Sequence, residues 1–451
     1  MEDQHPSANN TRDTECKISI TDHHQYFDGR RMHRVPQIMR FKKYNEEDYY
    51  APKMVSFGPY YHGLPELRMV EELKRKVLAD FVSSSCKDLF YSQIFKLIDQ
   101  IRNCYVGVSR DAYDDGALAE MMLLDAFFAI YLIEAYLGYQ QKFYHSHEHL
   151  GIAGRVFAVQ DMYLLENQIP LWVIKLLIKL MDGEGRMLIC KFSSYFFFAD
   201  SSRLKKIPGE DEKQPLHLLD AFHRILVKEL DNQGRELVEE PDNARNKPVN
   251  KCKWWPGRKE NPNEFGKYNR QSRSVTDLKA KGIHFKPSSY CLKNIKFKSY
   301  KFYGQLQLPF WFFSVYSKSF FTQMIAYEVS PGSVTGYIII SYVNFLKSLI
   351  VKPEDVKELR EKKILNSSLD SDEQIVKLIK EIDNYGLEDD GIFYEVKKGI
   401  EKHCSNKAKT WIAELINTHF RSPWTSIALL ATAFLLCLTF LQTYYTMNFP
   451  T

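Results

Sequence analysis

The chain has 451 residues and a net charge of +5; 45% of its residues are hydrophobic and 14% are aromatic. This composition excludes a disordered tether and predicts a packed body with one large core or two smaller ones. Eight scattered cysteines without a CxxC pair argue against a disulfide framework or a zinc site of the usual spacing, and favour reduced thiols.

The N-terminal part of the sequence divides into a polar start and a globular body. Residues 1–30 are polar and without a signal-like apolar stretch, so we expect them to be disordered. Residues 31–421 predict a mainly α body with a few short strands. Within it, YYAPKMVSFGPYYHG (49–63) is bounded by Pro and Gly and predicts an extended segment that enters a tight turn.

Helical patterns follow this turn. They begin at 64–80 and continue at MMLLDAFFAIYLIEAYL (121–137), which predicts a buried helix interrupted by one acid, Asp125. A membrane span at 121–137 is disfavoured because a central charge costs about 2.5–3.5 kcal/mol on the insertion scale. Residues 161–180 predict a helix, a polar corner and a second helix that starts near Pro170.

The second half of the body mixes strand and helix signals. The best strand candidates are LKNIKFKSYKF (292–302) and GYIIISYV (336–343). Helices are expected from Pro353, which is followed by two acids, and after Ser371, whose spacing to Gln374 is that of a capping box.

A basic stretch interrupts the body. Residues 245–301 hold sixteen Lys or Arg against three acids, and we treat about 241–290 as a linker-like insert. It is a solvated linker or a contact for anionic lipid; nucleic acid ranks last, because a membrane anchor would keep the chain away from most DNA. The candidate lipid contacts are Lys247, Lys251, Lys253, Trp254, Trp255, Arg258 and Lys259.

The C-terminal segment predicts a membrane anchor. Residues 422–446 carry no charged side chain and are long enough, as a helix, to cross the roughly 30 Å hydrocarbon layer of a bilayer, leaving a short tail at 447–451. The alternative is a buried C-terminal helix of a soluble domain. The proposed anchor residues are Trp424, Ile427, Leu429, Leu430, Phe434, Leu435, Leu436, Leu438, Phe440, Leu441, Tyr444 and Tyr445.

Charge around this segment predicts its orientation. Lys402, Lys407, Lys409 and Arg421 precede it and no basic residue follows it, so the positive-inside rule places the body in the cytosol. We therefore expect a single-pass membrane protein, with the plasma membrane favoured. Its expected partners are the lipid bilayer and a protein that the sequence does not identify.

Catalytic chemistry has little support in the sequence. The patterns GxxxxGK[ST], GxGxxG, GxSxG and HExxH are absent, and we predict no catalytic residue, cofactor or metal. Alternating His145, His147 and His149 would share one face of a strand and suit a metal, but a solvated loop is favoured. An unfamiliar hydrolase or transferase would draw on Ser56, His62, Asp125 and Glu166, for which structural roles are favoured.

Several of these stretches, taken in order, resemble the plant DUF247 family (domain of unknown function 247, of the UPF0481 type). The resemblance starts with RVPQIMR and YYAPKMVSFGPYYHG and continues with MMLLDAFF, LLENQIP, HLLDAFHRIL, VTDLKAKGIHFK, IKFKSYKFYGQLQLP and YVNFLKSLIVKPEDVKEL. It ends with SPW…LT..QTYYT and covers residues 34–446. The motif residues are Pro36, Pro52, Ser56, Gly58, Pro59, His62, Gly63, Asp125, Glu166, Asn167, Gln168 and Pro170.

Two departures accompany this resemblance. The family usually has two histidines before the glycine, where this chain has Tyr61 and His62, and an acidic turn after Pro309, where it has FWFFSVYSKS. The resemblance implies a plant origin, a helix-rich fold with a C-terminal anchor, and no established biochemical activity. Grass relatives implicated in pollen recognition at self-incompatibility loci suggest, by analogy alone, a recognition or signalling role.

Overall fold

The computed structural model describes residues 26–40, 48–228 and 273–448, apart from short gaps at 182–184, 200, 203, 211–212, 334, 388–390, 408, 410 and 412–422. The candidate lipid contacts between Lys247 and Lys259 lie outside these residues, as does most of the segment expected to be disordered. Its last residues make contacts: Tyr26 stacks on Trp172 with ring centroids 4.8 Å apart, and Arg30 pairs with Asp220 at 3.1 Å.

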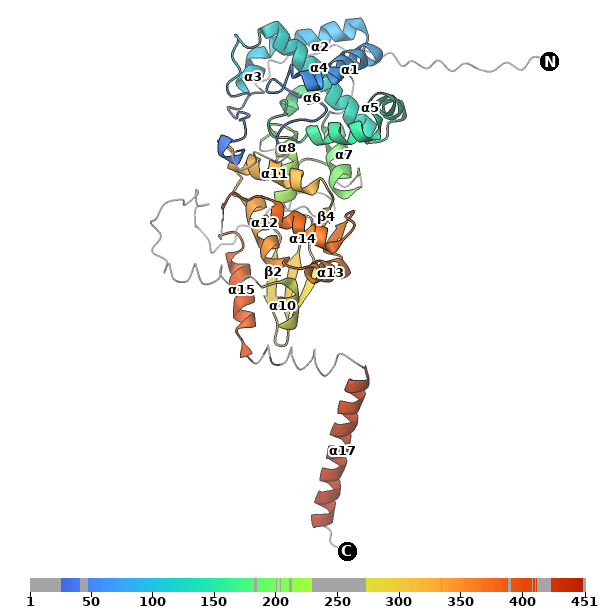
Figure 1. Cartoon of the computed structure of the whole chain (residues 1–451), viewed down its shortest axis with the longest axis vertical. Coiled ribbons are helices and arrows are strands. Elements are labelled where there is room, and N and C mark those ends of the chain that lie inside the picture. Colours follow the sequence, from blue (N-terminus) through green and yellow to red (C-terminus); the bar gives the residue numbers. More distant parts are fainter. Residues whose placement is uncertain are drawn as a thin grey trace, which may run out of the picture. The chain divides into compact units, whose positions relative to one another are not determined.

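The chain is mainly α, as predicted (Figure 1). It divides into two compact units, whereas the sequence left open one large core or two smaller ones. Unit 1 comprises Met1–Cys252, Tyr316–Ile340 and Ile382–Leu387; unit 2 comprises Lys253–Val315, Ser341–Glu381 and Glu388–Thr451. Each unit therefore uses segments that are distant in sequence.

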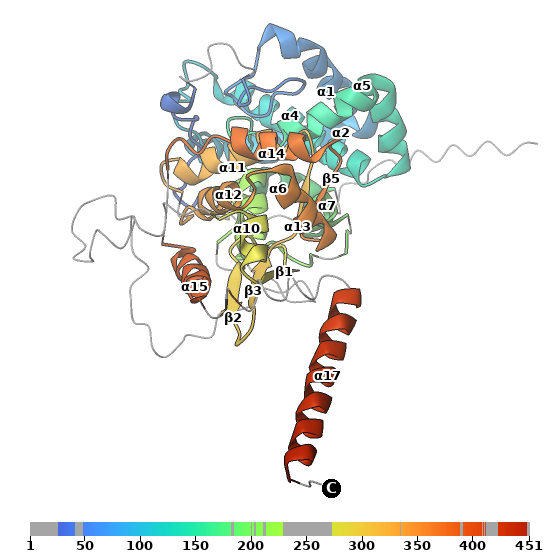
Figure 2. The same cartoon turned by 60° about the horizontal axis from the view of Figure 1, so that its bottom comes forward.

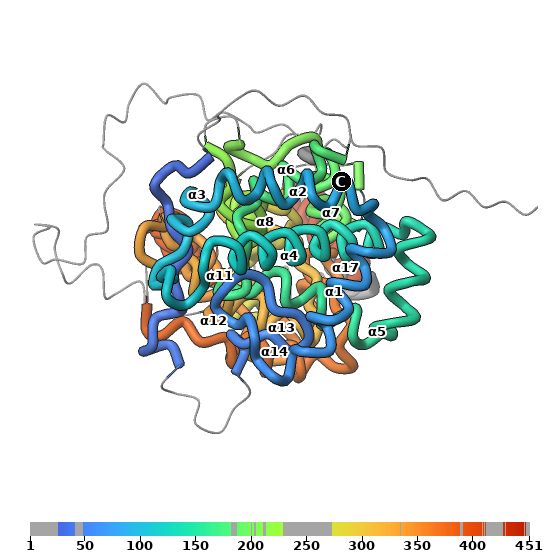
Figure 3. The backbone as a smooth tube through the Cα atoms, turned by 90° about the horizontal axis from the view of Figure 1, so that it is seen from above, coloured from blue at the N-terminus to red at the C-terminus, as the bar shows by residue number. Residues whose placement is uncertain are grey.

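Unit 1 is built around one buried helix, α4, with α1, α2, α5 and α6 packed against it (Figure 3). Among the described residues, α4 is the one helix long and apolar enough to cross a membrane, yet 83% of its apolar window is buried. The prediction of a buried helix over 121–137 is confirmed. The helices are α1 (Arg68–Phe81), α2 (Ser84–Lys96), α3 (Ile98–Asn103), α4 (Asp115–Tyr136), α5 (Gln140–Asp161), α6 (Leu171–Leu180), α7 (Gly185–Phe198), α8 (Leu218–Val227) and α11 (Ser317–Val329), with short 3-10 helices η1 (Gln37–Met39) and η2 (Pro65–Leu67).

Unit 2 combines helices with two small sheets. The three-stranded sheet has the order β1-β3-β2, with β1 parallel and β2 antiparallel to β3, and β4 pairs with β5 in parallel. The elements are α10 (Val275–Ala280), β1 (Ile283–Pro287), β2 (Lys296–Ser299), β3 (Gly304–Leu308), β4 (Trp311–Phe313), α12 (Ile338–Leu349), whose first residues belong to unit 1, α13 (Pro353–Glu361), β5 (Leu365–Ser367), α14 (Asp372–Glu381), α15 (Tyr394–Cys404) and α17 (Pro423–Asn448).

Some local predictions were wrong. Residues 336–343 begin helix α12 rather than a strand, because the buried Glu328 carboxylate accepts hydrogen bonds from the N–H groups of Ile339 (2.9 Å) and Ile340 (3.0 Å). A carboxylate at this position satisfies N-terminal donors that a helix leaves unpaired. Of the stretch 292–302, only β2 is a strand. Residues 162–170, expected to be partly helical, form the corner before α6.

The histidine cluster also differs from both of its expected forms. It lies within α5, neither in a strand nor in a loop, so the rings of His145 and His149 stack one turn apart at 4.3 Å while His147 is exposed on another face. No group of three potential metal ligands occurs among the residues with defined positions.

Two further features concern the C-terminal segment and the cysteines. Helix α17 extends over 26 residues, and its described side chains are exposed; its run Leu430–Tyr445 ranks among the shorter apolar helices. Cys104, Cys190, Cys291 and Cys404 are buried and Cys437 is exposed; these five cysteines are not in disulfides. Cys86 is disulfide-bonded, which contradicts the expectation of reduced thiols at that residue.

Candidate functional site: a buried polar network

The family-like motif residues converge on one extended segment of unit 1, residues 52–63. An extended segment without a strand partner must have its backbone N–H groups satisfied by side chains or water. Buried acids and an amide do this here. The Asp161 carboxylate accepts hydrogen bonds from the N–H groups of Lys53 (3.0 Å), Met54 (2.7 Å) and Val55 (2.8 Å). The Asn167 side-chain oxygen accepts from the N–H of Phe57, and the Asp125 carboxylate accepts from the N–H of Gly58, both at 2.7 Å.

Gly58 is at the closest approach of this segment to its neighbours. Its φ of +74° lies in the left-handed region, and a Cβ there would stand 2.5 Å from the carbonyl oxygen of Gln168. Both facts require glycine. Any other residue would be strained at this φ, and its Cβ would clash with a backbone oxygen that cannot move away without a large cost. The glycine of the SFGP motif thus has a steric cause.

A buried lysine joins this segment to two helices. Lys74 Nζ lies 2.6 Å from Asp125 Oδ1 in α4, 2.5 Å from Glu71 Oε1 in α1, and 2.6 Å from the carbonyl oxygen of Ser56. The Ser56 hydroxyl donates to Glu71 Oε1 at 2.5 Å. The Lys74 side chain is fully buried, so the two carboxylates supply the charge compensation that a buried cation requires.

Glu71 and Lys74 were not among the predicted site residues, although the sequence carries a signal for them. Both lie on the apolar face of α1 among Val70, Leu73 and Val77. Charged residues on the buried stripe of an amphipathic helix indicate a paired internal charge.

Burial sets the electrostatics of the acids. Burial raises the pKa of Asp125, an effect that the neighbouring Lys74 ammonium opposes and the Glu71 carboxylate reinforces. Burial likewise raises the pKa of Asp161 to about 7, against the three backbone N–H donors that favour its ionised form. Perturbed acids can mark functional sites, but ion-pair networks that only support a fold also perturb them.

Glu166 organises a second, neighbouring cluster. Its carboxylate accepts from the N–H of Val35 (2.6 Å), from the Arg40 guanidinium (2.8 Å) and from the Tyr61 hydroxyl (2.7 Å). It thereby holds the segment 32–40 against the corner before α6. Tyr61, which replaces the first histidine of the family pattern, thus makes a partly buried hydrogen bond to Glu166.

The amides beside Glu166 fix the corner itself. The Gln168 amide donates to the carbonyl oxygens of Met162 (2.8 Å) and Leu164 (2.7 Å), and the Asn167 amide donates to Val55 O (2.8 Å). The prolines and Gly63 shape the backbone. Pro36 precedes η1 and Pro170 is the N-cap of α6. Pro52 precedes the extended stretch, whereas Pro59 and Gly63, whose φ is +85°, lie in the turns that follow it.

Four residues were considered for hydrolase or transferase chemistry. Ser56, His62 and Asp125 lie near the Glu71–Lys74 pair, and Glu166 lies in the separate cluster. Ser56 is 1% exposed, which leaves a substrate no route to its hydroxyl. His62 Nδ1 is 3.8 Å from Glu71 Oε2, and neither of these buried atoms has a hydrogen-bond partner among the residues that the structure describes. The arrangement suits a structural brace between α1, α4 and the extended segment.

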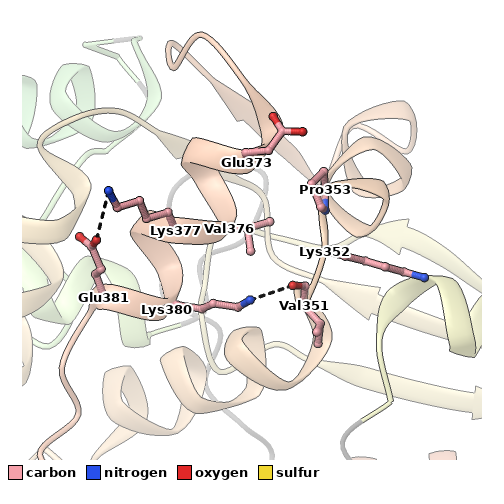
Figure 4. Close-up of a pocket in the computed structure, with 8 residues that line it drawn as sticks. All are labelled: Val351, Lys352, Pro353, Glu373, Val376, Lys377, Lys380 and Glu381. Atoms are coloured by element: carbon pink, nitrogen blue, oxygen red, sulfur yellow. Dashed lines mark hydrogen bonds and ion pairs between the residues drawn. The ribbon is translucent and has the colours of Figure 1, made fainter.

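A surface pocket of about 390 Å³ lies elsewhere, in unit 2, between the start of α13 and one side of α14 (Figure 4). Its charged rim is partly engaged, since Lys380 donates to the Val351 carbonyl oxygen at 2.9 Å and Lys377 pairs with Glu381 at 3.9 Å. No nucleophile with an adjacent base lines it, so it does not support the catalytic alternative. Its lining residues are Val351, Lys352, Pro353, Glu373, Val376, Lys377, Lys380 and Glu381.

The helix-rich fold and its buried network define a protein in which the motif residues brace one extended segment. The chain belongs to the DUF247 family, described as plant protein of unknown function, which it matches over residues 32–438. A UPF0481 protein of Arabidopsis thaliana is 26% identical over 415 residues, covering 87% of this chain and 82% of the relative. A putative UPF0481 protein of the same plant is 22% identical over 480 residues, covering 88% and 86%. No solved structure matches the chain.

Proposed function

We propose that this protein is anchored in a membrane by α17 and that its body acts through protein contacts rather than catalysis. The observation that carries the anchor is α17 itself, a 26-residue helix without a charged side chain. At 1.5 Å per residue it is about 39 Å long, more than the roughly 30 Å hydrocarbon core requires. Phe434 (65% exposed) and Phe440 (73% exposed) present apolar surface that lipid would cover.

The charges on either side of α17 support the orientation. Lys402, Lys407 and Lys409 precede the helix, and no basic residue follows it. By the positive-inside rule the body then faces the cytosol. We favour the plasma membrane as its location.

A recognition or signalling role agrees with the buried network. The charged motif residues are paired inside unit 1, so they rigidify a scaffold and leave recognition to its surface. Grass relatives implicated in pollen recognition at self-incompatibility loci support the same role by analogy alone. Anionic-lipid binding by the stretch 247–259 stays a prediction, because these residues lie outside the described structure.

Proximity labelling tests the contact role. A biotin ligase fused to the N-terminus of the full chain, expressed in plant tissue, is expected to label a set of proteins that a ligase fused to residues 412–451 alone does not label. The short fusion is the matched control, because it reaches the same membrane without the body. Identical sets for both fusions would contradict a body that works through protein contacts.

A further inference from the structure

The turn between β2 and β3 exposes three aromatic side chains. The two strands pair antiparallel with Ser299 opposite Gly304, so residues 300–303 form the turn, closed by a hydrogen bond from Tyr300 N to Tyr303 O at 2.8 Å. Tyr300 is 40%, Phe302 53% and Tyr303 39% exposed. Three aromatic rings that stay this exposed at one turn indicate a surface that another phase or molecule covers.

The same hairpin is strongly basic. Lys296, Lys298 and Lys301 are exposed, and none of them forms an ion pair within the described part of the chain. No acidic residue occurs at positions 278–327. Lys301 Nζ lies 5.3 Å from the centre of the Phe302 ring. Positive charge therefore lies beside the exposed rings, on three lysines without an ion-pair partner among the described residues.

We propose that this hairpin, residues 296–303, docks on the headgroup layer of an anionic membrane. Tyr and other amphipathic aromatic rings favour the level of the headgroups. Lysines near an anionic leaflet are attracted to it, each strengthening binding about fivefold. The interleaving of the two residue types gives the hairpin both interactions at once.

The connection of the hairpin to α17 supports this occupant and rests on the proposed anchor. Helix α15 packs on β2 (Figure 2). After α15, Lys409 Nζ donates to Ser299 Oγ and to the Tyr300 carbonyl oxygen, both at 2.8 Å. Pro423, where α17 begins, follows Lys409 by fourteen residues. A chain of that length reaches at most about 50 Å, so an anchored α17 keeps the hairpin close to the bilayer surface.

The hairpin is also held in one conformation. The Tyr300 and Tyr303 rings stack at 4.7 Å, and His284 of β1 contacts Tyr303 edge-on at 5.4 Å. A Cβ at Gly304 would stand 3.0 Å from Ile283 and 3.1 Å from Phe297, so the base of the turn is tightly packed. Pre-ordered aromatic side chains lose little entropy on docking.

Photo-crosslinking in the full chain tests the proposal. Phe302→p-benzoylphenylalanine is reconstituted into liposomes of phosphatidylcholine with about one third phosphatidylserine, irradiated, and analysed by mass spectrometry. We expect a covalent lipid adduct at position 302. The matched control is Tyr144→p-benzoylphenylalanine, at an exposed site on α5 of unit 1, for which we expect little or no adduct.

Charge removal gives the second arm. The triple variant K296Q/K298Q/K301Q, carrying the same probe at 302, is expected to lower the adduct at least about tenfold, and so are liposomes of phosphatidylcholine alone. An adduct to a second protein chain, or no lipid adduct in protein that floats with the liposomes, would overturn the hairpin contact while leaving the anchor intact. Protein that does not float contradicts the anchor, and with it the tether of the hairpin.

Discussion

Replacing the buried lysine, Lys74→Met, should lower the free energy of unfolding by about 3–5 kcal/mol. The ammonium lies within 2.6 Å of one carboxylate and 2.5 Å of another, and its side chain is fully buried. Methionine fills a similar volume but leaves Asp125 and Glu71 as facing acids in a site that excludes water. The expected result is a clear fall in the midpoint of urea unfolding.

Two further variants separate charge from packing. Arg75→Met, on the exposed face of the same helix, should change stability by less than about 0.5 kcal/mol. Asp125→Asn in the Lys74→Met background should recover at least about 1 kcal/mol, since it removes one of the uncompensated charges. Equal effects of the two single variants, or a double variant less stable than Lys74→Met, would contradict the role of the buried ion pair.

Acid should destabilise unit 1 through His217, the N-cap of α8. Its Nδ1 accepts the N–H of Asp220 at 3.1 Å, which requires the neutral ring. Burial lowers the pKa of His217 to about 4, an effect opposed by Asp220 and reinforced by Arg30 and Arg224. In the unfolded chain the pKa of His217 is near 6.5. The stability that its neutral ring contributes is therefore fully present above pH 6.5 and is lost as the pH falls towards 4. The loss amounts to about 3 kcal/mol.

The measurement is the urea midpoint from pH 7.5 down to pH 4.5. Asp220 does not titrate in this pH range. Burial would raise the pKa of Asp220, but Arg224 and the other partners hold it at about 2, so the stability that Asp220 contributes is lost only at lower pH. Asp161, whose pKa burial raises to about 7, titrates in the same window with the opposite sign in the wild type and in the variants alike. The contribution of His217 is therefore the difference between the wild-type profile and that of His217→Asn, which keeps a good N-cap without a titrating ring and should lack the loss at acid pH. His147→Asn, at an exposed position in α5, should keep the wild-type slope. An unchanged slope in His217→Asn would contradict this assignment.

Much of the fold follows from the sequence where periodicity is strong. The apolar run at 121–137 predicted the helix that is found as α4. Pro353 and the two acids after it predicted the first turn of α13. Residues 336–343 were predicted as a strand because isoleucine favours strands. The contact that favours the helix comes from Glu328, which precedes Ile339 and Ile340 by eleven and twelve residues. A single sequence does not show which acid will cap which helix.

The candidate site was predictable in its residues but not in its connections. Asp125 and Glu166 were identified as acids among apolar residues, yet their partners Lys74 and Arg40 come from other elements, 51 and 126 residues away. Pairing over such separations depends on the packing of α1 and α4. The division into two units was hidden for the same reason, because residues 316–340 and 382–387 join unit 1 only after folding.

Carbonate extraction of membranes tests the central proposal, the anchor, most directly. Plant membranes containing the full chain are compared with membranes from cells that express a chain ending at Phe420. The anchor predicts that the full chain stays in the pellet at alkaline pH and that the shortened chain is released to the supernatant. Release of the full chain, or equal retention of both chains, would contradict a bilayer-spanning α17.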